Sequence, residues 1–273
     1  MSKPSALPTH RVESGERVAL ADIDPDQTAG FESKADATEP TDAARERIRS
    51  LQERLFAEDR RSLLIVLQAI DTGGKDGAIK HVFGGVNPQG CQVSSFKVPS
   101  GEELKHDFLW RYHQRTPGRG MIAIFNRSHY EDVLVVRVKH LVPEKVWRAR
   151  YELINDFEKL LVRSDVTVVK FFLHISKAEQ KHRLEVRRDD PLKQWKFALG
   201  DIEERALWDD YQAAFEDAIN ATSTGGAPWY VVPANKKWYR NLVVARTIAD
   251  TLEAMDPQYP APEPGIDRVA IPD

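Results

Sequence analysis

A chain of 273 residues with 41% hydrophobic side chains is long enough to bury a substantial core, and we expect one large domain. Its 39 basic residues are offset by 42 acidic residues, and the formal net charge of −3 excludes a global positive field that would draw the protein onto nucleic acid or a membrane surface. A lone cysteine, the lack of an apolar segment after a basic start, and a longest apolar run of only Leu63–Leu67 predict a cytoplasmic protein that is neither secreted nor membrane-spanning.

The first part of the chain differs in composition from the rest. Residues 1–40 are rich in Pro, Ser, Thr, Asp and Glu and contain few large apolar side chains, so they would bury little surface on ordering. From Thr41 onward, apolar residues recur at three- and four-residue intervals, which is the spacing of an amphipathic helix with Thr41 as its N-cap. We therefore expect an extended N-terminal arm over residues 1–40 and a folded domain from residue 41.

A buried strand and a glycine-rich turn are predicted after this helix. Residues 63–70 (LLIVLQAI) form a nearly continuous apolar run, which is typical of a parallel strand buried on both faces. The turn 71–77 (DTGGKDG) ends the run, and a helix can start at Ala78. A second strand is expected at Gln92–Val98 and a further helix at Glu102–Tyr112.

The rest of the chain alternates between strands and long helices. Strands are predicted at Met121–Phe125, Val166–Ile175 and Trp229–Pro233, and helices at Pro143–Val162 and Lys177–Asn220. This alternation predicts a three-layer α/β fold with a mainly parallel sheet, whose ligands bind beyond the carboxyl ends of the strands. Residues 41–255 are expected to form this domain, followed by a C-terminal tail over residues 256–273.

The glycine-rich turn is similar to a phosphate-binding loop. In the pattern G-x-x-x-x-G-K-[ST], backbone N–H groups and a lysine surround phosphate oxygens, while the hydroxyl residue holds magnesium. The register here is Ala69-x-x-x-x-Gly74-Lys75-Asp76, which departs from the pattern at both ends but has a strand before it and a helix after it. We predict phosphate binding by Thr72, Gly73, Gly74, Lys75, Asp76 and Gly77. The alternative is an ordinary glycine-rich turn between a strand and a helix.

Asp71 is the candidate metal ligand. Because Asp76 replaces the hydroxyl residue that usually holds magnesium, the carboxylate of Asp71 at the end of the strand is the better donor for the ion. The alternative role for Asp71 is that of an N-cap or turn residue that accepts hydrogen bonds from its own loop.

Polar residues also follow the strand at Met121–Phe125, and the ends of neighbouring parallel strands converge on one crevice. Arg127 would point its guanidinium at phosphate, while Asn126 and Asp132 would orient a nucleophile or a metal-bound water. The predicted catalytic set is Asp71, Lys75, Arg127 and Asp132, and the predicted binding set includes Asn126, Ser128, His129, Tyr130 and Glu131. For His129 and Tyr130, a packed and hydrogen-bonded wall is favoured over a catalytic role.

A cationic segment is predicted to form a lid around residues 177–200. Helical spacing places Arg183, Arg187 and Arg188 near one another, and Lys193 and Lys196 follow after a turn. Such a charge run is often a solvated face. Near a phosphate loop it also fits a lid that closes over a phosphate chain and shields transition-state charge.

A few further residues are assigned from their neighbourhood. Lys80, Lys97 and Arg111 extend the positive surface in this interpretation, and the helix with His106, Asp107 and Trp110 borders a bound nucleotide. Three tryptophans are expected in the core instead of stacking on a base: Trp147, Trp208 and Trp238.

Three motifs taken together resemble the polyphosphate kinase 2 family. They are Asp71–Gly77 (DTGGKDG), Asn126–Asp132 (NRSHYED) and Asp190–Lys196 (DPLKQWK), and the likeness runs from about Thr41 to about Leu252. The resemblance implies a thymidylate-kinase-like P-loop fold with a helical lid. It also implies that Mg²⁺, with Mn²⁺ as a substitute, and a basic channel hold polyphosphate against a nucleoside mono- or diphosphate, in a homodimer or homotetramer.

The resemblance also assigns roles to single residues: the loop carboxylate to Asp71, the phosphate-loop lysine to Lys75, the strand-end arginine to Arg127, and lid contacts to Arg183 and Arg187. Many relatives carry aspartate where this chain has Asn126, and with Glu131 and Asp132 following it the chain resembles the branch that accepts AMP as well as ADP. The implied activity is a reversible, magnesium-dependent transfer of a phosphoryl group between polyphosphate and AMP or ADP, with GMP and GDP as alternatives.

Two other functions fit the same residues. An ATP-dependent nucleoside monophosphate kinase would share the loop, the lid and the α/β core, and a non-catalytic polyphosphate or nucleotide sensor would keep Lys75 for affinity. For the polyphosphate kinase, the expected mechanism is direct transfer without a phosphoenzyme. In it, magnesium and Lys75 align the terminal phosphoryl with the acceptor while Arg127 and the lid arginines neutralise charge.

Overall fold

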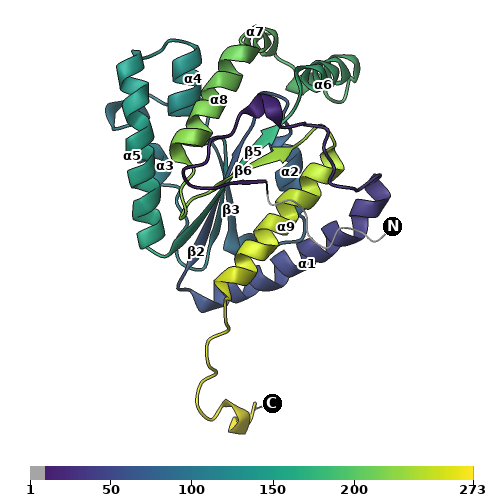
Figure 1. Ribbon diagram of the computed structural model, residues 1–273. Coiled ribbons are helices and arrows are strands. Elements are labelled where there is room, and N and C mark those ends of the chain that lie inside the picture. Colours follow the sequence, from purple (N-terminus) through teal and green to yellow (C-terminus); the bar gives the residue numbers. More distant parts are fainter. Residues whose placement is uncertain (1–9, 273) are drawn as a thin grey trace.

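The computed structural model describes residues 10–272, which fold around a six-stranded sheet (Figure 1). The strands are β1 (Arg11–Val12), β2 (Ser62–Gln68), β3 (Cys91–Ser95), β4 (Ile122–Asn126), β5 (Val166–His174) and β6 (Trp229–Pro233). They lie in the order β1-β6-β5-β2-β4-β3, and each pairing is parallel except that of β1 with β6. The predicted α/β fold with a mainly parallel sheet is confirmed.

Strand β2 lies inside the sheet, between β4 and β5. All 7 of its residues are buried, as expected of a parallel strand that is covered on both faces. After β2 the chain builds β3 and β4 on one side and later β5 and β6 on the other, so the topology switches direction at its carboxyl end. Ligands bind at such switch points in open α/β sheets.

Helices cover both faces of the sheet and give the three layers (Figure 1). One face carries α1 (Lys34–Glu58), α2 (Lys75–Val82) and α9 (Lys237–Met255), and the other carries α4 (Glu131–Val138), α5 (Glu144–Arg163) and α8 (Trp208–Thr222). Each helix buries its apolar side. Leu55 of α1 and Leu252 of α9, for example, are fully buried. Burial of such faces against the sheet supplies the main driving force for this arrangement.

The N-terminal segment packs more closely than its composition predicts. Residues 1–9 of the predicted arm lie outside the described residues. Strand β1 pairs with β6, a 3₁₀ turn spans Leu20–Asp22, and the side chains of Leu20 and Phe31 are buried in the core. A few large apolar side chains are thus sufficient to anchor the segment, because the sheet offers an open edge at β6.

Helix α1 begins earlier than predicted, so the boundary between arm and domain at residues 40 and 41 is wrong. The helix begins at Lys34, where Ser33 and Asp36 form a capping box: the Asp36 N–H donates to the Ser33 hydroxyl at 3.3 Å, and the Ser33 N–H donates to the Asp36 carboxylate at 2.9 Å. Thr41 is therefore an interior helix residue and not an N-cap.

Two long predicted helices are interrupted. The helix predicted at Glu102–Tyr112 consists of a 3₁₀ turn (Glu103–Lys105) and α3 (Trp110–His113), because the Asp107 carboxylate accepts from the Leu109 N–H and forms a local turn. The helix predicted at Lys177–Asn220 is divided into α6 (Lys177–Asp189), a 3₁₀ turn (Gln194–Lys196), α7 (Gly200–Ala206) and α8. The first of these breaks is caused by Pro191, which forces an extended backbone on the preceding residue.

The remaining segments match the predictions more closely. Strand β6 has the predicted bounds, and Trp147 and Trp208 are buried while Trp238 packs half-buried against the core. Residues 256–272 extend away from the body beyond α9 (Figure 1), with a 3₁₀ turn at Ile266–Arg268. Another 3₁₀ turn spans Pro88–Gly90. No helix within residues 10–272 has both the length and the apolar character that a membrane crossing requires.

Candidate active site

A cleft of about 800 Å³ opens at the carboxyl ends of β2 and β4, where the loop before α2 meets the segment around α6 and the start of α9. Its lining includes the lysine and arginine side chains Lys75, Lys97, Arg127, Arg183, Arg187, Lys193, Lys196, Lys237 and Arg240. Only three carboxylates among the described residues line it with them, Asp71, Asp76 and Asp201. In a chain whose net charge is −3, this local excess of cations indicates a site for a polyanion.

The loop after β2 has the geometry of a phosphate cradle. Thr72 and Gly74 adopt left-handed backbone conformations with φ of 65° and 98°, and Gly74 is the N-cap of α2. A Cβ atom at Gly73 would lie 2.4 Å from the Cβ of Ala69, so a side chain does not fit there. The loop delivers the N-terminus of α2 to the cleft, where the free N–H groups and the helix dipole favour an anion.

Lys75 is the first residue of α2 and lines the cleft. Its Nζ folds back over the loop and donates to the carbonyl oxygen of Ala69 at 3.0 Å. Burial and the neighbouring Arg127 lower the pKa of Lys75, while Asp71 opposes that shift. A phosphate oxygen would give this ammonium a stronger, charge-assisted partner than the neutral carbonyl does.

Arg127 reaches the same loop from the end of β4. Its backbone is left-handed, with φ of 64°, and its N–H donates to the Leu67 carbonyl at 3.2 Å. The guanidinium pairs with Asp71 Oδ1 at 2.7 Å through Nη2 and with Glu131 Oε2 at 3.3 Å through Nη1. Because the Arg127 side chain is still 40% exposed, it is free to exchange these partners for a ligand.

Asp71, Asp76 and Asn126 supply the oxygen atoms beside the loop. Asn126 Nδ2 donates to Asp76 Oδ1 at 2.6 Å, which joins the end of β4 to the start of α2. Within residues 10–272, no group of three or more His, Cys, Asp and Glu side chains is arranged to hold a metal ion alone. Two carboxylates at a phosphate site nevertheless fit Mg²⁺, because that ion is usually held by one or two carboxylates together with water and substrate phosphates.

Two buried arginines approach the loop from its other side. Arg183 of α6 donates to the Thr72 carbonyl at 3.0 Å and to the Ala234 carbonyl at 2.6 Å. Arg240 of α9 donates to the Gly74 carbonyl at 3.1 Å, and burial together with the nearby Arg183 lowers its pKa to about 10. Arg183 already pairs with the Glu179 carboxylate at 2.6 Å, so an anion bound at the loop would chiefly neutralise Arg240.

The segment predicted as a lid contributes its cations to the cleft. Arg187, Lys193 and Lys196 all line the cleft as predicted. Lys193 Nζ pairs with Asp190 Oδ2 at 2.5 Å, and Lys196 Nζ lies 4.8 Å from the centroid of the Trp195 ring. These contacts involve exposed side chains and are worth little individually, so phosphate can replace them at small cost.

Eight residues predicted for the site are not part of the cleft lining: Gly73, Lys80, Ser128, His129, Tyr130, Glu131, Asp132 and Arg188. Helix α4 begins at Glu131, so each successive side chain rotates by about 100° away from the loop. The Asp132 carboxylate accepts from the Tyr112 hydroxyl at 2.8 Å and pairs with Arg150 at 3.3 Å, and its predicted catalytic role is not supported. Lys80 and Arg188 are exposed, and Arg188 pairs with its neighbour Asp189.

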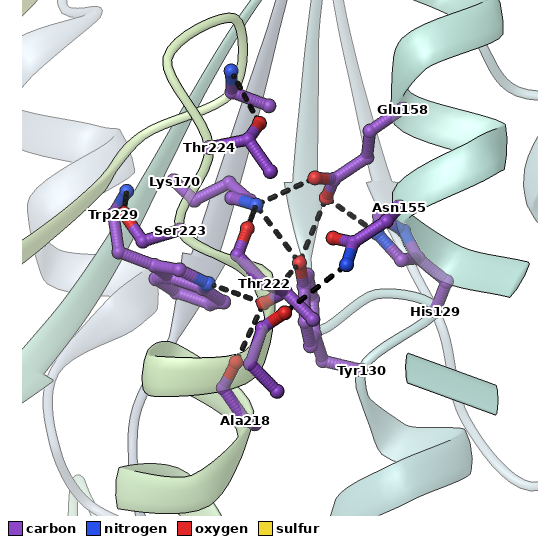
Figure 2. Close-up of polar contacts among 12 residues, drawn as sticks. His129, Tyr130, Asn155, Glu158, Lys170, Ala218, Thr222, Ser223, Thr224 and Trp229 are labelled. Atoms are coloured by element: carbon purple, nitrogen blue, oxygen red, sulfur yellow. Dashed lines mark hydrogen bonds and ion pairs between the residues drawn. The ribbon is translucent and has the colours of Figure 1, made fainter. Parts of the chain in front are cut away.

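Ser128, His129 and Tyr130 are fully buried behind the cleft. Ser128 accepts from Gln68, while His129 and Tyr130 both contact Glu158 (Figure 2). The hydrogen-bonded wall favoured for His129 and Tyr130 is confirmed, and ligand contact by these three side chains is wrong. Of the residues assigned from their neighbourhood, Lys97 lines the cleft. Arg111, His106, Asp107 and Trp110 do not, and the rings of His106 and Trp110 stack on each other with centroids 4.0 Å apart.

Two cations that line the cleft, Lys237 and Arg240, are not among the residues predicted from the sequence. Both follow β6, the last strand of the parallel sheet, and α9 begins at Lys237. Because the carboxyl ends of parallel strands lie at one edge of the sheet, the residues directly after β6, like those after β4, are expected to line the cleft. The signal in the sequence is the run Asn235–Arg240 (NKKWYR), which has lysine or arginine at three of the five positions 236–240.

The mainly parallel sheet, the glycine loop at its switch point and the cations gathered around that loop are typical of a P-loop phosphotransferase. Comparison with known proteins narrows this class: residues 31–260 match the family Polyphosphate kinase 2 (PPK2), and the chain belongs to that family. It is 53% identical to the AMP/ADP-polyphosphate phosphotransferase of Meiothermus ruber, over 96% of this chain and 98% of that protein. It is 44% identical to the ADP-polyphosphate phosphotransferase of Rhodopseudomonas palustris, over 93% and 92% of the two chains.

A solved structure supports the same assignment. The crystal structure of polyphosphate kinase 2 from Arthrobacter aurescens TC1 matches this fold with a TM-score of 0.91 and 46% sequence identity, over 94% of this chain and 92% of that one. The predicted family, its P-loop fold and its class of enzyme, a polyphosphate kinase, are confirmed.

Proposed function

We propose that this chain transfers a phosphoryl group reversibly between inorganic polyphosphate and AMP or ADP. The observation that carries the proposal is the gathering of lysine and arginine side chains around the glycine loop, because a chain of phosphates can pair with so many cations at once. A single mononucleotide would leave several of them without an anion. The relative from Meiothermus ruber is named for AMP and ADP, and the one from Rhodopseudomonas palustris for ADP.

The proposed transfer is direct, from the end of polyphosphate to the acceptor phosphate. Lys75 and Arg127 bind the transferred group and neutralise the charge that develops on its oxygens, while the backbone of the loop fixes its position. Arg183 and the lid cations hold the flanking phosphates and exclude water. Asp71, with Asp76 beside it, would hold Mg²⁺ or Mn²⁺, and the ion would supply further charge neutralisation on phosphate oxygens. Asp132 has no catalytic role in this proposal, because Tyr112 and Arg150 hold its carboxylate away from the cleft.

Asn126 supports the proposal of two acceptors. An amide at this position places one carboxylate fewer beside the phosphates than an aspartate would, and it also fixes Asp76 through the hydrogen bond at 2.6 Å. The lower negative charge favours anionic acceptors whether they carry one phosphate or two. GMP and GDP are alternative acceptors in the same proposal.

A donor comparison tests the function. Purified protein is incubated with Mg²⁺, long-chain polyphosphate and either AMP or ADP, and the nucleotide products are separated by chromatography. We expect ADP and ATP from AMP, and ATP from ADP. Product from ADP alone would remove the AMP activity. Turnover of AMP with ATP but not with polyphosphate would indicate a conventional monophosphate kinase, and binding of polyphosphate without turnover would indicate a sensor.

We also propose that the chain is cytoplasmic and forms a homodimer or homotetramer, without a nucleic-acid or membrane partner. Val146, Leu153 and Leu160 recur every seven residues along α5 and are 41%, 48% and 53% exposed, which makes an apolar stripe suited to a second helix. Sedimentation velocity should show an oligomer that Leu153→Glu dissociates. A monomeric wild-type protein at micromolar concentration would contradict this part of the proposal.

A further inference from the structure

A buried ion pair joins β5 to α5 (Figure 2), and it contacts the turn after β4 that carries Arg127. Lys170 of β5 and Glu158 of α5 are separated by 2.5 Å from Nζ to Oε2, and their side chains are 0% and 1% exposed. Lys170 Nζ also donates to the Thr222 carbonyl at 2.7 Å, at the end of α8. Neither member of the pair lines the cleft, and the transfer chemistry uses neither of them.

Two residues of the Arg127 turn are attached to this pair. The Tyr130 hydroxyl donates to Glu158 Oε1 at 2.8 Å and accepts from Lys170 Nζ at 2.9 Å. His129 Nε2 lies 3.1 Å from the same Glu158 oxygen (Figure 2). The turn between β4 and α4 is therefore held by β5 and α5 together, starting two residues after Arg127.

A buried ion pair fills this space at a cost in solvation free energy. Burying two charges costs solvation free energy, and apolar side chains of similar volume are often at least as stabilising. The turn in front of the pair is itself strained, because Arg127 has a φ of 64°, which non-glycine residues keep only where their surroundings enforce it. Directional hydrogen bonds from a fixed pair can enforce such a conformation, whereas apolar contacts specify it less sharply.

We propose that Glu158 and Lys170 are positioning residues for phosphoryl transfer. Through His129 and Tyr130 they keep the turn in the conformation that directs the Arg127 guanidinium to the glycine loop. The inference rests on the proposed function, in which Arg127 neutralises charge on the transferred group. A displacement of about 1 Å at such a group is sufficient to lower a rate by about 100-fold.

The test replaces both charges with apolar side chains, Glu158→Leu together with Lys170→Met, in the full chain. The single replacements are avoided because each leaves an unpaired buried charge, which is strongly destabilising. With polyphosphate and AMP, we expect kcat to fall by about 10- to 100-fold while KM for each substrate changes little, because the lost interaction acts in the transition state. In an Arg127→Ala background, the same double replacement should leave kcat unchanged, since the group that it misplaces is absent.

A matched control separates positioning from stability. Leu252→Ala truncates a fully buried side chain of α9, on the face of the sheet opposite the pair, and should lower the thermal midpoint without changing kcat. If the double replacement does not fold, Tyr130→Phe removes only the hydroxyl that joins Glu158 to Lys170, and it enters the same comparison with and without Arg127.

Two results would overturn the inference alone: a wild-type kcat in the double replacement, or an equal loss of kcat in the presence and absence of Arg127. Wild-type turnover is measured first. If the wild-type protein does not transfer phosphate from polyphosphate, the proposed function fails and this inference falls with it, so the two failures are distinguishable.

Discussion

Replacing Arg127 with alanine should separate catalysis from folding. Its carboxylate partners Asp71 and Glu131 lie at 2.7 Å and 3.3 Å, but the three side chains are 40%, 28% and 20% exposed. Ion pairs as exposed as these contribute about 0–1 kcal/mol each. Burial already raises the pKa of Glu131, so this carboxyl can take up a proton when its partner is lost. The free energy of unfolding should fall by about 1 kcal/mol, or about 2–4 °C in the thermal midpoint.

The same substitution should affect phosphoryl transfer far more. Charge in the transition state is spread over the oxygens of the transferred group, and one preorganised donor at such a position is worth about 2.7–4 kcal/mol. Because each 1.36 kcal/mol changes a rate by about tenfold, kcat should fall by about 10²–10³. The predicted loss in catalysis is thus several times the predicted loss in stability.

Initial rates of ADP formation from AMP, with Mg²⁺ and saturating polyphosphate, measure this loss, and thermal melts of the same preparations measure stability. Arg137→Ala is the control, because Arg137 of α4 forms a comparable ion pair with Asp217 at 2.7 Å but does not line the cleft. The control should lose similar stability and keep its kcat. A kcat for Arg127→Ala within about threefold of the wild-type value would refute the reasoning.

Three further predictions follow from the same geometry. Lys75→Ala should lower kcat by about 10²–10³ with an unchanged circular dichroism spectrum, and a near-normal kcat would contradict the assignment of the loop. Arg240→Met removes a buried cation beside Gly74 and should weaken polyphosphate binding by about 10- to 100-fold in calorimetric titrations. An unchanged affinity would contradict the assignment of polyphosphate to this cleft. Burial raises the pKa of Cys91 to about 11, so at pH 8 iodoacetamide should alkylate it more slowly in the native than in the urea-unfolded chain. The folded-state pKa of Cys91 exceeds its ordinary value of 9.0, so the stability that the protonated thiol contributes is complete below pH 9 and is lost as pH rises towards about 11. Thermal melts of the wild-type protein and of Cys91→Ala across this pH range should show that loss in the wild type only.

The main features of the site could be predicted because they follow from topology. Strands β2 and β4 are visible as apolar runs in the sequence, and the residues directly after parallel strands must meet at one end of the sheet. This brings the loop at Asp71–Gly77 together with Arg127. The cleft cations of residues 177–200 could be predicted for a similar reason, since α6 follows the carboxyl end of β5.

The site residues that were predicted wrongly are those whose side-chain direction is set by a local turn. Asp132 is one residue into α4, and the helical rotation directs it to Tyr112 and Arg150 and not to the cleft. Nothing in the spacing of the sequence shows that Tyr130 meets Glu158, because that contact depends on how α5 packs on the sheet.

Helix ends are a second source of error. The pattern Ser33-x-x-Asp36 is a capping signal of its own, but the polar composition around it favours an extended arm. A short local signal of this kind is decisive once the following helix can pack on α9, and packing of that kind is not visible in the sequence.

The most direct test of the account follows the phosphoryl group itself. Wild-type protein is mixed with Mg²⁺, AMP and polyphosphate labelled with ³²P, quenched during the first turnovers, and separated into nucleotide and protein fractions. Direct transfer in the cationic cleft predicts label in ADP and none on the protein. Unlabelled nucleotide would contradict the assignment of polyphosphate as the donor, and label on the protein would contradict direct transfer.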